Sequence, residues 1–385
     1  MFGETDYERL YRDVIPSVVS LYVGRRAPSV GAGSGFVYDD QHVLTNQHVV
    51  DGAAAVELRF ADGGWATGEV VGTDAYTDLA VVAVEDLPES ATPLPVAGEN
   101  PSPGRPVAAL GNPLGLDGSI TAGIVSGSNR SMPTSGGFAI PDVVQTDAPI
   151  NPGNSGGPLV ALDGDGGYEV VGVNRARQGD NIGFAVSPTI VERVVPELVE
   201  SGRYAHSYLR ARTLDVTPTV AEANGADEPR GVLVVDIAEQ SSAGRRGQSD
   251  DIAEQSSAGR RGRPDDIAER SSTDGRTQSD ETESDALRGA DDTRDVRGQR
   301  VPVGGDIIVG IGGNELRSHE ELMRYLITET RPGEPVEIDV IRDGVERTLS
   351  VTLDERPSPE DRRRERRARE GGRGGARRGS NVPVR

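Results

Sequence analysis

The sequence lacks two residue types altogether, cysteine and lysine. Without cysteine the chain can form no disulfide, has no thiol nucleophile and offers no thiolate ligand to a metal. Without lysine it cannot contain the phosphate-binding loop that ends in Gly-Lys-Ser/Thr, so we expect no nucleotide-driven activity. Any chemistry must therefore rest on other side chains.

Aromatic residues are also scarce, at 4%, and hydrophobic residues make up only 35% of the 385 residues. The length allows two or three domains, but this composition predicts that part of the chain lies outside any packed core. No apolar run reaches the roughly 18 residues that a membrane-spanning helix needs. The N-terminus lacks the basic start and apolar core of a secretory signal, so we expect a cytoplasmic protein. A start codon further upstream would change that expectation to an extracytoplasmic one.

Basic residues number 41 against 62 acidic ones, which gives a net charge of −21, and every cation is arginine. Such a chain repels nucleic acid and anionic membranes, so neither is an expected partner. Excess acid with low hydrophobicity is typical of proteins that stay soluble in concentrated salt, where the Debye length falls to about 3 Å at 1 M. We therefore predict a halophilic, archaeal source.

The stretch 145–160 places Ser155 among the glycines Gly153, Gly156 and Gly157. Glycine adopts backbone angles that other residues resist, so consecutive N–H groups can turn inward. An inward-facing pair of N–H groups is what a developing oxyanion requires. Taken alone, the same stretch is also consistent with a glycine-rich turn between two strands.

A serine hydroxyl becomes a nucleophile only with a base beside it and an acid that orients the base. His48 follows a short apolar strand and opens a helical turn, whereas His42 starts that strand and is expected to be exposed. Asp78 leads into the apolar run 79–82. The order His48, Asp78, Ser155 is one of the chain orders of the Ser-His-Asp triad, the one found on chymotrypsin-like double barrels.

Five segments in this order resemble the HtrA (Deg) family of trypsin-like serine proteases, and together they are far more specific than any one alone. They are residues 31–37, 44–50, 77–82, 153–159 and 181–186. The resemblance implies a chymotrypsin-like double β-barrel over residues 15–202, with Ser155 as nucleophile, His48 as base and Asp78 as the orienting acid.

The resemblance also implies an oxyanion hole in the loop Gly153, Asn154 and Ser155, with the backbone N–H groups of the first and last as donors. The residue before the serine is Asn154, whereas digestive proteases have an aspartate that captures a freshly cut N-terminus. Because an amide cannot form that ion pair, activation by N-terminal cleavage is not expected.

By resemblance, the wall of the substrate pocket lies at Arg175, Ala176, Arg177 and Ile182. In a strand the two arginines point to one face and Ala176 to the other. If the arginine face lines the pocket, acidic side chains are favoured; if it faces solvent, the pocket is small and apolar, which we favour.

Three further features of this domain are predicted. Residues 1–14 form an N-terminal segment with a short helix, which in the family helps to form a trimer. The stretch 127–140 is predicted as a long Gly/Ser-rich loop, and such loops are usually functional or mobile. A capped helix that begins at Ser187 should close the domain.

Residues 207–355 form a second module, with strands at 231–237 and 303–313, a helix at 318–328 and a closing hairpin. It resembles the circularly permuted PDZ domain that follows HtrA proteases, an α+β fold that binds an extended C-terminal peptide at a sheet edge. Its carboxylate loop matches Tyr208, Leu209, Arg210 and Ala211, where the family pattern has glycine at the position of Arg210. That side chain either obstructs the loop or forms a salt bridge to the bound carboxylate.

A 15-residue unit that starts at Asp236 recurs from Asp251 and, degenerated, from Asp266. It offers one isoleucine per repeat, too little for a buried face, so we predict a disordered insertion at about 240–300 within the PDZ domain. The Arg/Gly-rich tail 356–385 is predicted to be disordered as well.

These features predict a serine endopeptidase that cleaves unfolded or damaged proteins, with no metal or cofactor. Its expected partners are unfolded polypeptides, C-terminal peptides at the PDZ domain, and other copies of the chain in a homo-oligomer, by resemblance a trimer. The alternative is a chaperone or PDZ scaffold with low or conditional proteolytic activity, since the family can hold its active site disordered.

Overall fold

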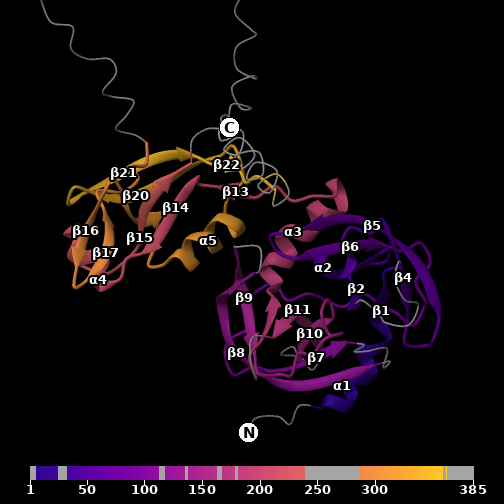
Figure 1. Ribbon diagram of the computed structural model, residues 1–385. Helices are drawn as coiled ribbons and strands as arrows, with labels where there is room; N and C mark the ends of the chain where they lie inside the picture. Colours follow the sequence, from indigo (N-terminus) through magenta and orange to yellow (C-terminus); the bar gives the residue numbers. More distant parts are fainter. Residues whose placement is uncertain are drawn as a thin grey trace, which may run out of the picture. The chain divides into compact units, whose positions relative to one another are not determined.

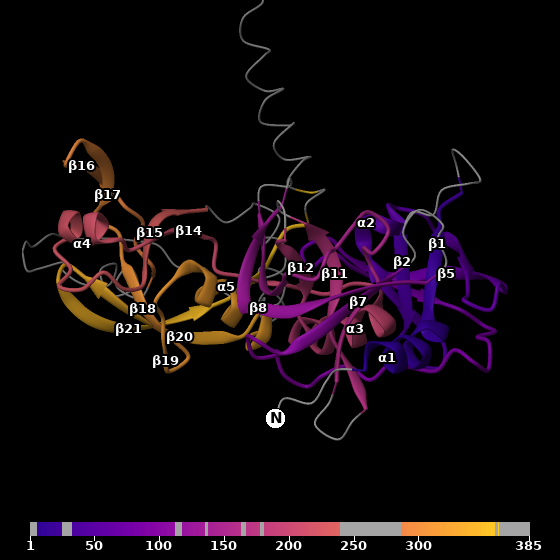
Figure 2. The same ribbon diagram turned by 90° about the horizontal axis from the view of Figure 1, so that it is seen from below.

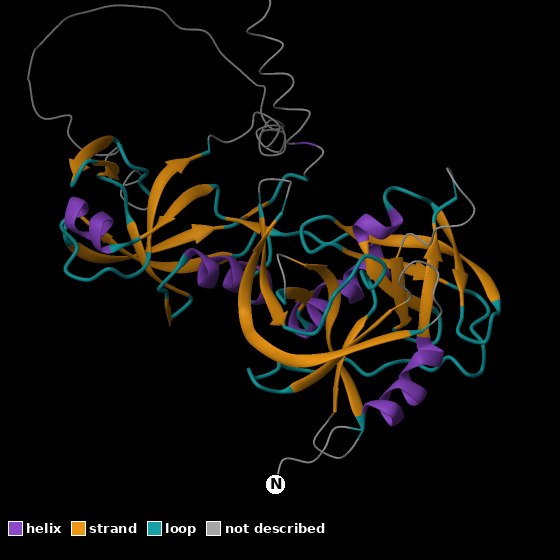
Figure 3. Cartoon of the chain, turned by 60° about the horizontal axis from the view of Figure 1, so that its bottom comes forward, coloured by secondary structure: helices purple, strands orange, loops and turns teal. Residues whose placement is uncertain are grey.

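The computed structural model describes residues 6–24, 33–111, 118–134, 138–162, 167–177, 181–238, 286–358 and 361. The chain divides into two compact units. The first comprises Met1–Ser207, Glu320–Pro332 and Glu355–Arg385, and the second comprises Tyr208–His319 and Gly333–Asp354. Strands predominate over helices in both, as Figure 3 shows. The mostly β architecture predicted from the sequence is confirmed.

The first unit contains two closed antiparallel barrels, coloured indigo and magenta in Figure 1. The strands of the first barrel are β1 (Val18–Tyr22), β2 (Gly33–Val37), β3 (His42–Asn46), β4 (Ala55–Arg59), β5 (Trp65–Asp74) and β6 (Leu79–Ala83). Those of the second are β7 (Pro106–Gly111), β8 (Ser119–Pro133), β9 (Ala139–Thr146), β10 (Pro158–Leu162), β11 (Tyr168–Arg177) and β12 (Gly183–Val186). The strand orders are β1-β2-β3-β6-β5-β4 and β10-β11-β12-β9-β8-β7. The predicted double barrel is confirmed.

Short helices flank the barrels. They are α1 (Tyr7–Val14), the 3-10 turn η1 (Ile15–Ser17), α2 (Gln47–Val50) and α3 (Pro188–Ser201); α5 (His319–Thr328) falls almost wholly in the first unit by the division above. The predicted cap of α3 is present, because the Ser187 side chain accepts a hydrogen bond from the N–H of Ile190. Among the described helices, none has both the length and the apolar character that a membrane span requires.

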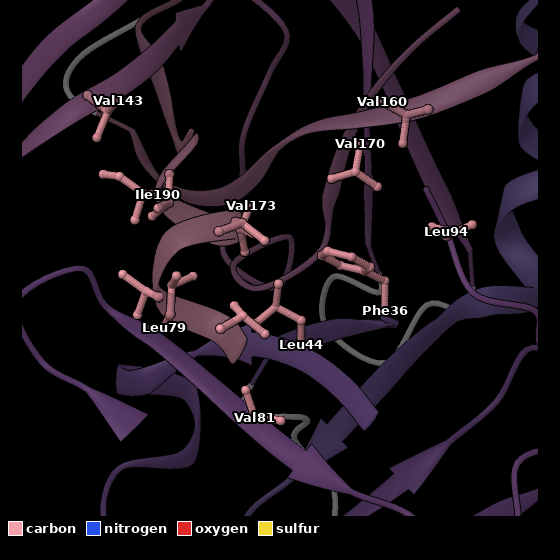
Figure 4. Close-up of a cluster of buried hydrophobic side chains, with 14 of the residues drawn as sticks. Phe36, Leu44, Leu79, Val81, Leu94, Val143, Val160, Val170, Val173 and Ile190 are labelled. Carbon is pink, nitrogen blue, oxygen red and sulfur yellow. The ribbon is translucent and has the colours of Figure 1, made fainter. Parts of the chain in front are cut away.

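A single apolar cluster joins the two barrels. Figure 4 shows side chains from both barrels and from α3 meeting in it: Phe36, Leu44, Leu79, Val81, Leu94, Val143, Val160, Val170, Val173 and Ile190. Each large side chain buried in this way stabilises the fold by about 1.5–3 kcal/mol. Separate apolar clusters fill the interior of each barrel. Because the shared cluster fixes one barrel against the other, side chains from both can meet at a defined distance.

The predicted long loop at 127–140 is wrong over most of its length. β8 continues to Pro133 and β9 begins at Ala139, and the two strands pair with register shifts between Val125 and Met132. Met132 and Ile140 are buried, so these apolar anchors hold the strands together through a glycine- and serine-rich sequence.

The second unit is built on an antiparallel sheet with the order β14-β15-β18-β20-β21. Its strands are β14 (Ala211–Asp215), β15 (Val232–Ile237), β18 (Ile307–Ile311), β20 (Pro335–Arg342) and β21 (Val345–Thr352), with β19 (Asn314–Glu315) on β18. The helix α4 (Pro218–Asn224) completes an α+β fold, and β13 (Ser207–Tyr208) pairs with β22 (Asp354–Glu355). The predicted strands and closing hairpin of this module are present.

The predicted disordered insertion at about 240–300 is wrong at its C-terminal end. Residues 286–300 are described and include β16 (Asp292–Val296) and the start of β17 (Gln299–Val303), a hairpin that lies beside α4 in Figure 2. Val296 and Val301 are buried in the core of this unit, which accounts for the order of this polar stretch. The remainder of the predicted insertion, 240–285, and nearly all of the tail lie outside the described residues.

Candidate active site

His48 and Asp78 are brought together by the pairing of β3 with β6. Asn46 lies opposite Leu79 in this ladder, so the residues that follow β3 meet the residue that precedes β6. The Asp78 carboxylate accepts two hydrogen bonds from His48: Oδ1 lies 3.0 Å from the backbone nitrogen and Oδ2 lies 2.7 Å from Nδ1. The Asp78 side chain is 5% exposed and the His48 ring is 46% exposed. A buried carboxylate thus holds a solvent-accessible imidazole.

The backbone of Asp78 is also held in place by hydrogen bonds. Its φ of 60° lies in the left-handed region, where aspartate and asparagine are the most tolerant non-glycine residues. Its carbonyl oxygen accepts hydrogen bonds from the Gln47 N–H and the Asn46 Nδ2, both at 3.0 Å. These bonds hold the carboxylate on the His48 side of the turn.

Ser155 lies in the loop between β9 and β10 of the second barrel, and this loop is pinned against the first barrel. The Ser155 carbonyl accepts the N–H of Ser34 at 2.8 Å. Gly156 has a φ of 85°, and a Cβ added there would lie 2.1 Å from the Ser34 carbonyl oxygen and 2.3 Å from the Thr45 Oγ1. Only glycine permits this close approach, which brings the serine from one barrel to the histidine and aspartate of the other.

The Ser155 hydroxyl donates a hydrogen bond to the carbonyl oxygen of Arg175 at 2.7 Å. Within the described residues no hydrogen bond joins it to His48. Catalytic hydrogen bonds are often long or unmade in proteins without substrate, so this geometry is compatible with a serine-histidine pair that forms on substrate binding.

The loop before Ser155 has two N–H groups free to face an oxyanion. Gly153 has a φ of 107°, and its carbonyl accepts the Ser34 hydroxyl at 2.5 Å. The N–H of Asn154 donates to the Asn151 carbonyl at 3.0 Å, so the inclusion of Asn154 as an oxyanion-binding residue is wrong for its backbone donor. Across the described part of the chain, the N–H groups of Gly153 and Ser155 donate no hydrogen bond.

The Arg175 side chain is 20% exposed and its guanidinium binds the triad acid, so the solvent-facing orientation that we favoured does not hold for this arginine. Its Nε lies 2.7 Å from Oδ2 of Asp78, and its Nη1 lies 3.6 Å from the sulfur of Met132. The pairing of β11 with β12 shifts register between Asn174 and Ala176, so Arg175 sits at a bulge and the simple alternation of a strand does not apply.

The other predicted pocket residues are placed less fully. Ala176 and Arg177 pair with Phe184 and Gly183 through the backbone of β11, and their side chains lie outside the described structure. Ile182 precedes β12 and is exposed. The character of the substrate pocket therefore stays a prediction.

In the second unit, Arg210 occupies the position where a glycine was expected. Its φ of 58° explains that expectation, because glycine adopts this conformation without cost. Its guanidinium binds Asp354 of the same chain, and this hydrogen bond raises the pKa of Arg210. Tyr208 lies before it, with Leu209 buried, and Ala211 opens β14.

The contact between Arg175 and the triad acid is the feature that sequence reasoning missed. An arginine at a strand position carries no signal of a bulge, and only the register shift re-aims it. No group of three or more His, Asp or Glu side chains that could hold a metal ion is present in the described ranges.

Two regions of the chain match known families. Residues 33–173 match the trypsin-like peptidase domain and residues 285–353 match the PDZ domain. The chain is 31% identical over 367 residues to Protease Do-like 1, chloroplastic, of Arabidopsis thaliana, a match that covers 91% of this chain and 72% of that protein. It is 30% identical over 347 residues to Serine protease Do-like HtrA of Bacillus subtilis, covering 85% of this chain and 64% of that protein.

Solved structures of proteases from the same family are also similar to this chain. The HtrA-type protease AlgW with a tripeptide resembles this structure with a TM-score of 0.65 at 26% identity, covering 92% of this chain and 99% of that one. The chain spans only 54% to 64% of the length of relatives from Synechocystis, Marinomonas and Bacillus subtilis. With a trypsin-like peptidase domain, a PDZ domain and this similarity over most of its length, the chain belongs to the HtrA (Do-like) family of serine proteases.

Proposed function

We propose that this protein is a serine endopeptidase that cleaves unfolded or damaged polypeptides. The observation that carries the proposal is the convergence of His48 and Asp78 from one barrel with Ser155 from the other. The names of its relatives as serine proteases support the same activity.

In the proposed mechanism the Ser155 hydroxyl breaks its hydrogen bond to the Arg175 carbonyl and donates one to Nε2 of His48 instead. His48 takes the serine proton as Ser155 attacks the peptide carbonyl, and Asp78 stabilises the imidazolium that forms. The N–H groups of Gly153 and Ser155 hold the oxyanion, a role typically worth about 10²–10³ in rate for one donor. His48 then returns the proton to the leaving amine as the C–N bond breaks and an acyl-enzyme forms on Ser155. A water molecule that gives its proton to His48 attacks this ester, and His48 passes the proton back to Ser155 as the acid product leaves.

We infer further that the PDZ domain binds extended C-terminal peptides, since such domains add a peptide strand to a sheet edge. The AlgW relative was solved with peptides, which supports peptide binding in this family. We also infer a homo-oligomer, with the trimer as the expected state, and adaptation to high salt, supported by the net charge of −21. Analytical ultracentrifugation in molar salt tests the oligomeric state. The melting temperature of the protein, compared between low and molar salt, tests the adaptation to high salt.

The decisive experiment is degradation of unfolded β-casein in molar salt by the wild type and by Ser155→Ala. We expect cleavage by the wild type alone, and the cut sites will define the substrate pocket. If the folded wild type leaves casein intact, the chaperone or scaffold alternative replaces the proposal.

A further inference from the structure

Arg175 touches two members of the triad at once. Its backbone carbonyl accepts the Ser155 hydroxyl at 2.7 Å, and its Nε donates to Oδ2 of Asp78 at 2.7 Å. The Arg175 side chain is only 20% exposed. A largely buried guanidinium is costly unless it is paired, and the only ion pair that the described residues offer it is with Asp78.

The oxygen that Arg175 binds is the one that His48 uses. Nδ1 of His48 also lies 2.7 Å from Oδ2 of Asp78, while Oδ1 is occupied by the His48 backbone N–H. A cation and an imidazole therefore share one carboxylate oxygen. An opposite charge nearby favours the ionised form of a group. Because the Arg175 cation already neutralises much of the Asp78 charge, this carboxylate stabilises a protonated His48 less than an unpaired carboxylate would.

Other charged groups that contact the turn before Asp78 have partners of their own. On the turn that carries Asp78, the Asp74 carboxylate is paired with the His206 ring at 2.8 Å, and the Arg356 guanidinium lies over the Tyr76 ring. The neighbour from β8 is the uncharged Met132. Across the described structure, His48 and Arg175 are the charged partners of Asp78 itself.

We propose that Arg175 is a positioning residue of the active site: it holds the Asp78 oxygen that also binds His48, and its charge competes with a protonated imidazole for that carboxylate. The catalytic role of Arg175 rests on the proposed function, but the contacts among Arg175, Asp78 and His48 can be tested without it.

The sharpest variant is Arg175→Gln, because glutamine places its amide nitrogen at the same point along the side chain as the arginine Nε. It keeps a donor and removes the charge. In a Ser155→Ala background, NMR of histidine rings labelled with ¹³C would follow the titration of His48, identified by comparison with His48→Gln. Ser155→Ala removes the hydrogen bond from the hydroxyl to the Arg175 backbone carbonyl, but it removes neither partner of the two side-chain contacts with Asp78.

We expect the His48 titration to move to higher pH in Arg175→Gln than in its parent, because the carboxylate loses the cation that competes for it. The matched control is Arg105→Gln, since Arg105 pairs with Glu169 of the same strand β11, also at 2.7 Å. This control should leave the His48 titration where it is. If Arg175→Gln does not fold, Arg175→Ala, which has no side-chain donor, should give a shift in the same direction.

With active protein, the acid limb of the profile of kcat/KM against pH should move upward in Arg175→Gln, with KM little changed. An unchanged His48 titration in both Arg175 variants, or an equal shift in the Arg105 control, overturns the proposal. The ring titration needs no turnover, so a failed casein assay with a shifted titration rejects the protease function and leaves the role of Arg175 standing.

Discussion

Two buried arginine-aspartate pairs, one in each unit, are built differently. In the second unit, Arg342 meets Asp306 with two nitrogens on two oxygens, each at 2.7 Å, and the Arg288 N–H adds a third bond to the same carboxylate. In the first unit, Arg175 reaches Asp78 through Nε alone, at an oxygen already bound to His48.

The difference separates a structural ion pair from a functional one. A two-pronged contact satisfies the carboxylate completely and fixes its geometry, which suits a core position where Asp306 is 0% exposed. A one-pronged contact leaves the carboxylate shared with a group that must gain and lose a proton. Breaking the first pair should therefore change stability, and changing the second should change chemistry.

The largest expected effect is that of Asp78→Asn. Asparagine tolerates the left-handed backbone of this position, so the fold should persist. The amide cannot stabilise the imidazolium, and kcat should fall about 10⁴-fold, as triad chemistry predicts. Peptide hydrolysis and thermal melting measure the two quantities, and a fall below tenfold would remove Asp78 from the triad.

Next in size is Arg342→Met, which leaves the Asp306 carboxylate buried and unpaired. Such a loss costs about 3–5 kcal/mol. The sole tryptophan, Trp65, belongs to the first barrel, so limited proteolysis of the second unit is the better readout. The control is Arg342→Met with Asp306→Leu, which removes both charges and should restore most of the loss. Equal destabilisation by the double variant would contradict a pairing role.

The features that could be predicted from the sequence are those set by local patterns, and those that could not depend on contacts with distant strands and helices. His48, Asp78 and Ser155 could be predicted because each stands in a local pattern that chemistry requires: a strand end, a strand start and a glycine loop. The role of Arg175 could not be predicted, because the direction of its side chain depends on a register shift between β11 and β12. No local sequence pattern shows how these two strands align. Likewise, Val296 and Val301 gain their order from α4, far away in the chain, so a polar composition alone predicted disorder wrongly.

A third prediction concerns the buried pair of Asp74 and His206, at 2.8 Å. Burial alone would raise the pKa of Asp74, but the charge of His206 and hydrogen bonds from His206, Thr77 and Tyr76 hold the pKa below its ordinary value. A carboxylate with a lowered folded pKa adds stability above its unfolded pKa of about 3.9 and loses it as the pH falls.

The change Asp74→Asn should therefore cost about 1–3 kcal/mol of unfolding free energy at neutral pH. The difference from the wild type should shrink as the pH drops below about 4. The control is Asp39→Asn, because Asp39 pairs with His42 at the same 2.8 Å in a more exposed setting. Chemical denaturation across pH gives both values, and a pH-independent difference would show that the charge of Asp74 does not matter.

The smallest effect is expected at Arg210, whose partner Asp354 is 43% exposed. Surface ion pairs contribute about 0–1 kcal/mol, and salt screens them. In Arg210→Gly the lost pair is offset by relief of the left-handed backbone, while glycine loosens the unfolded chain. The melting temperature should thus barely move, in low salt or in molar salt. A loss as large as that of Arg342→Met would mean that this exposed pair also holds the fold, and that exposure does not separate the two kinds of arginine contact.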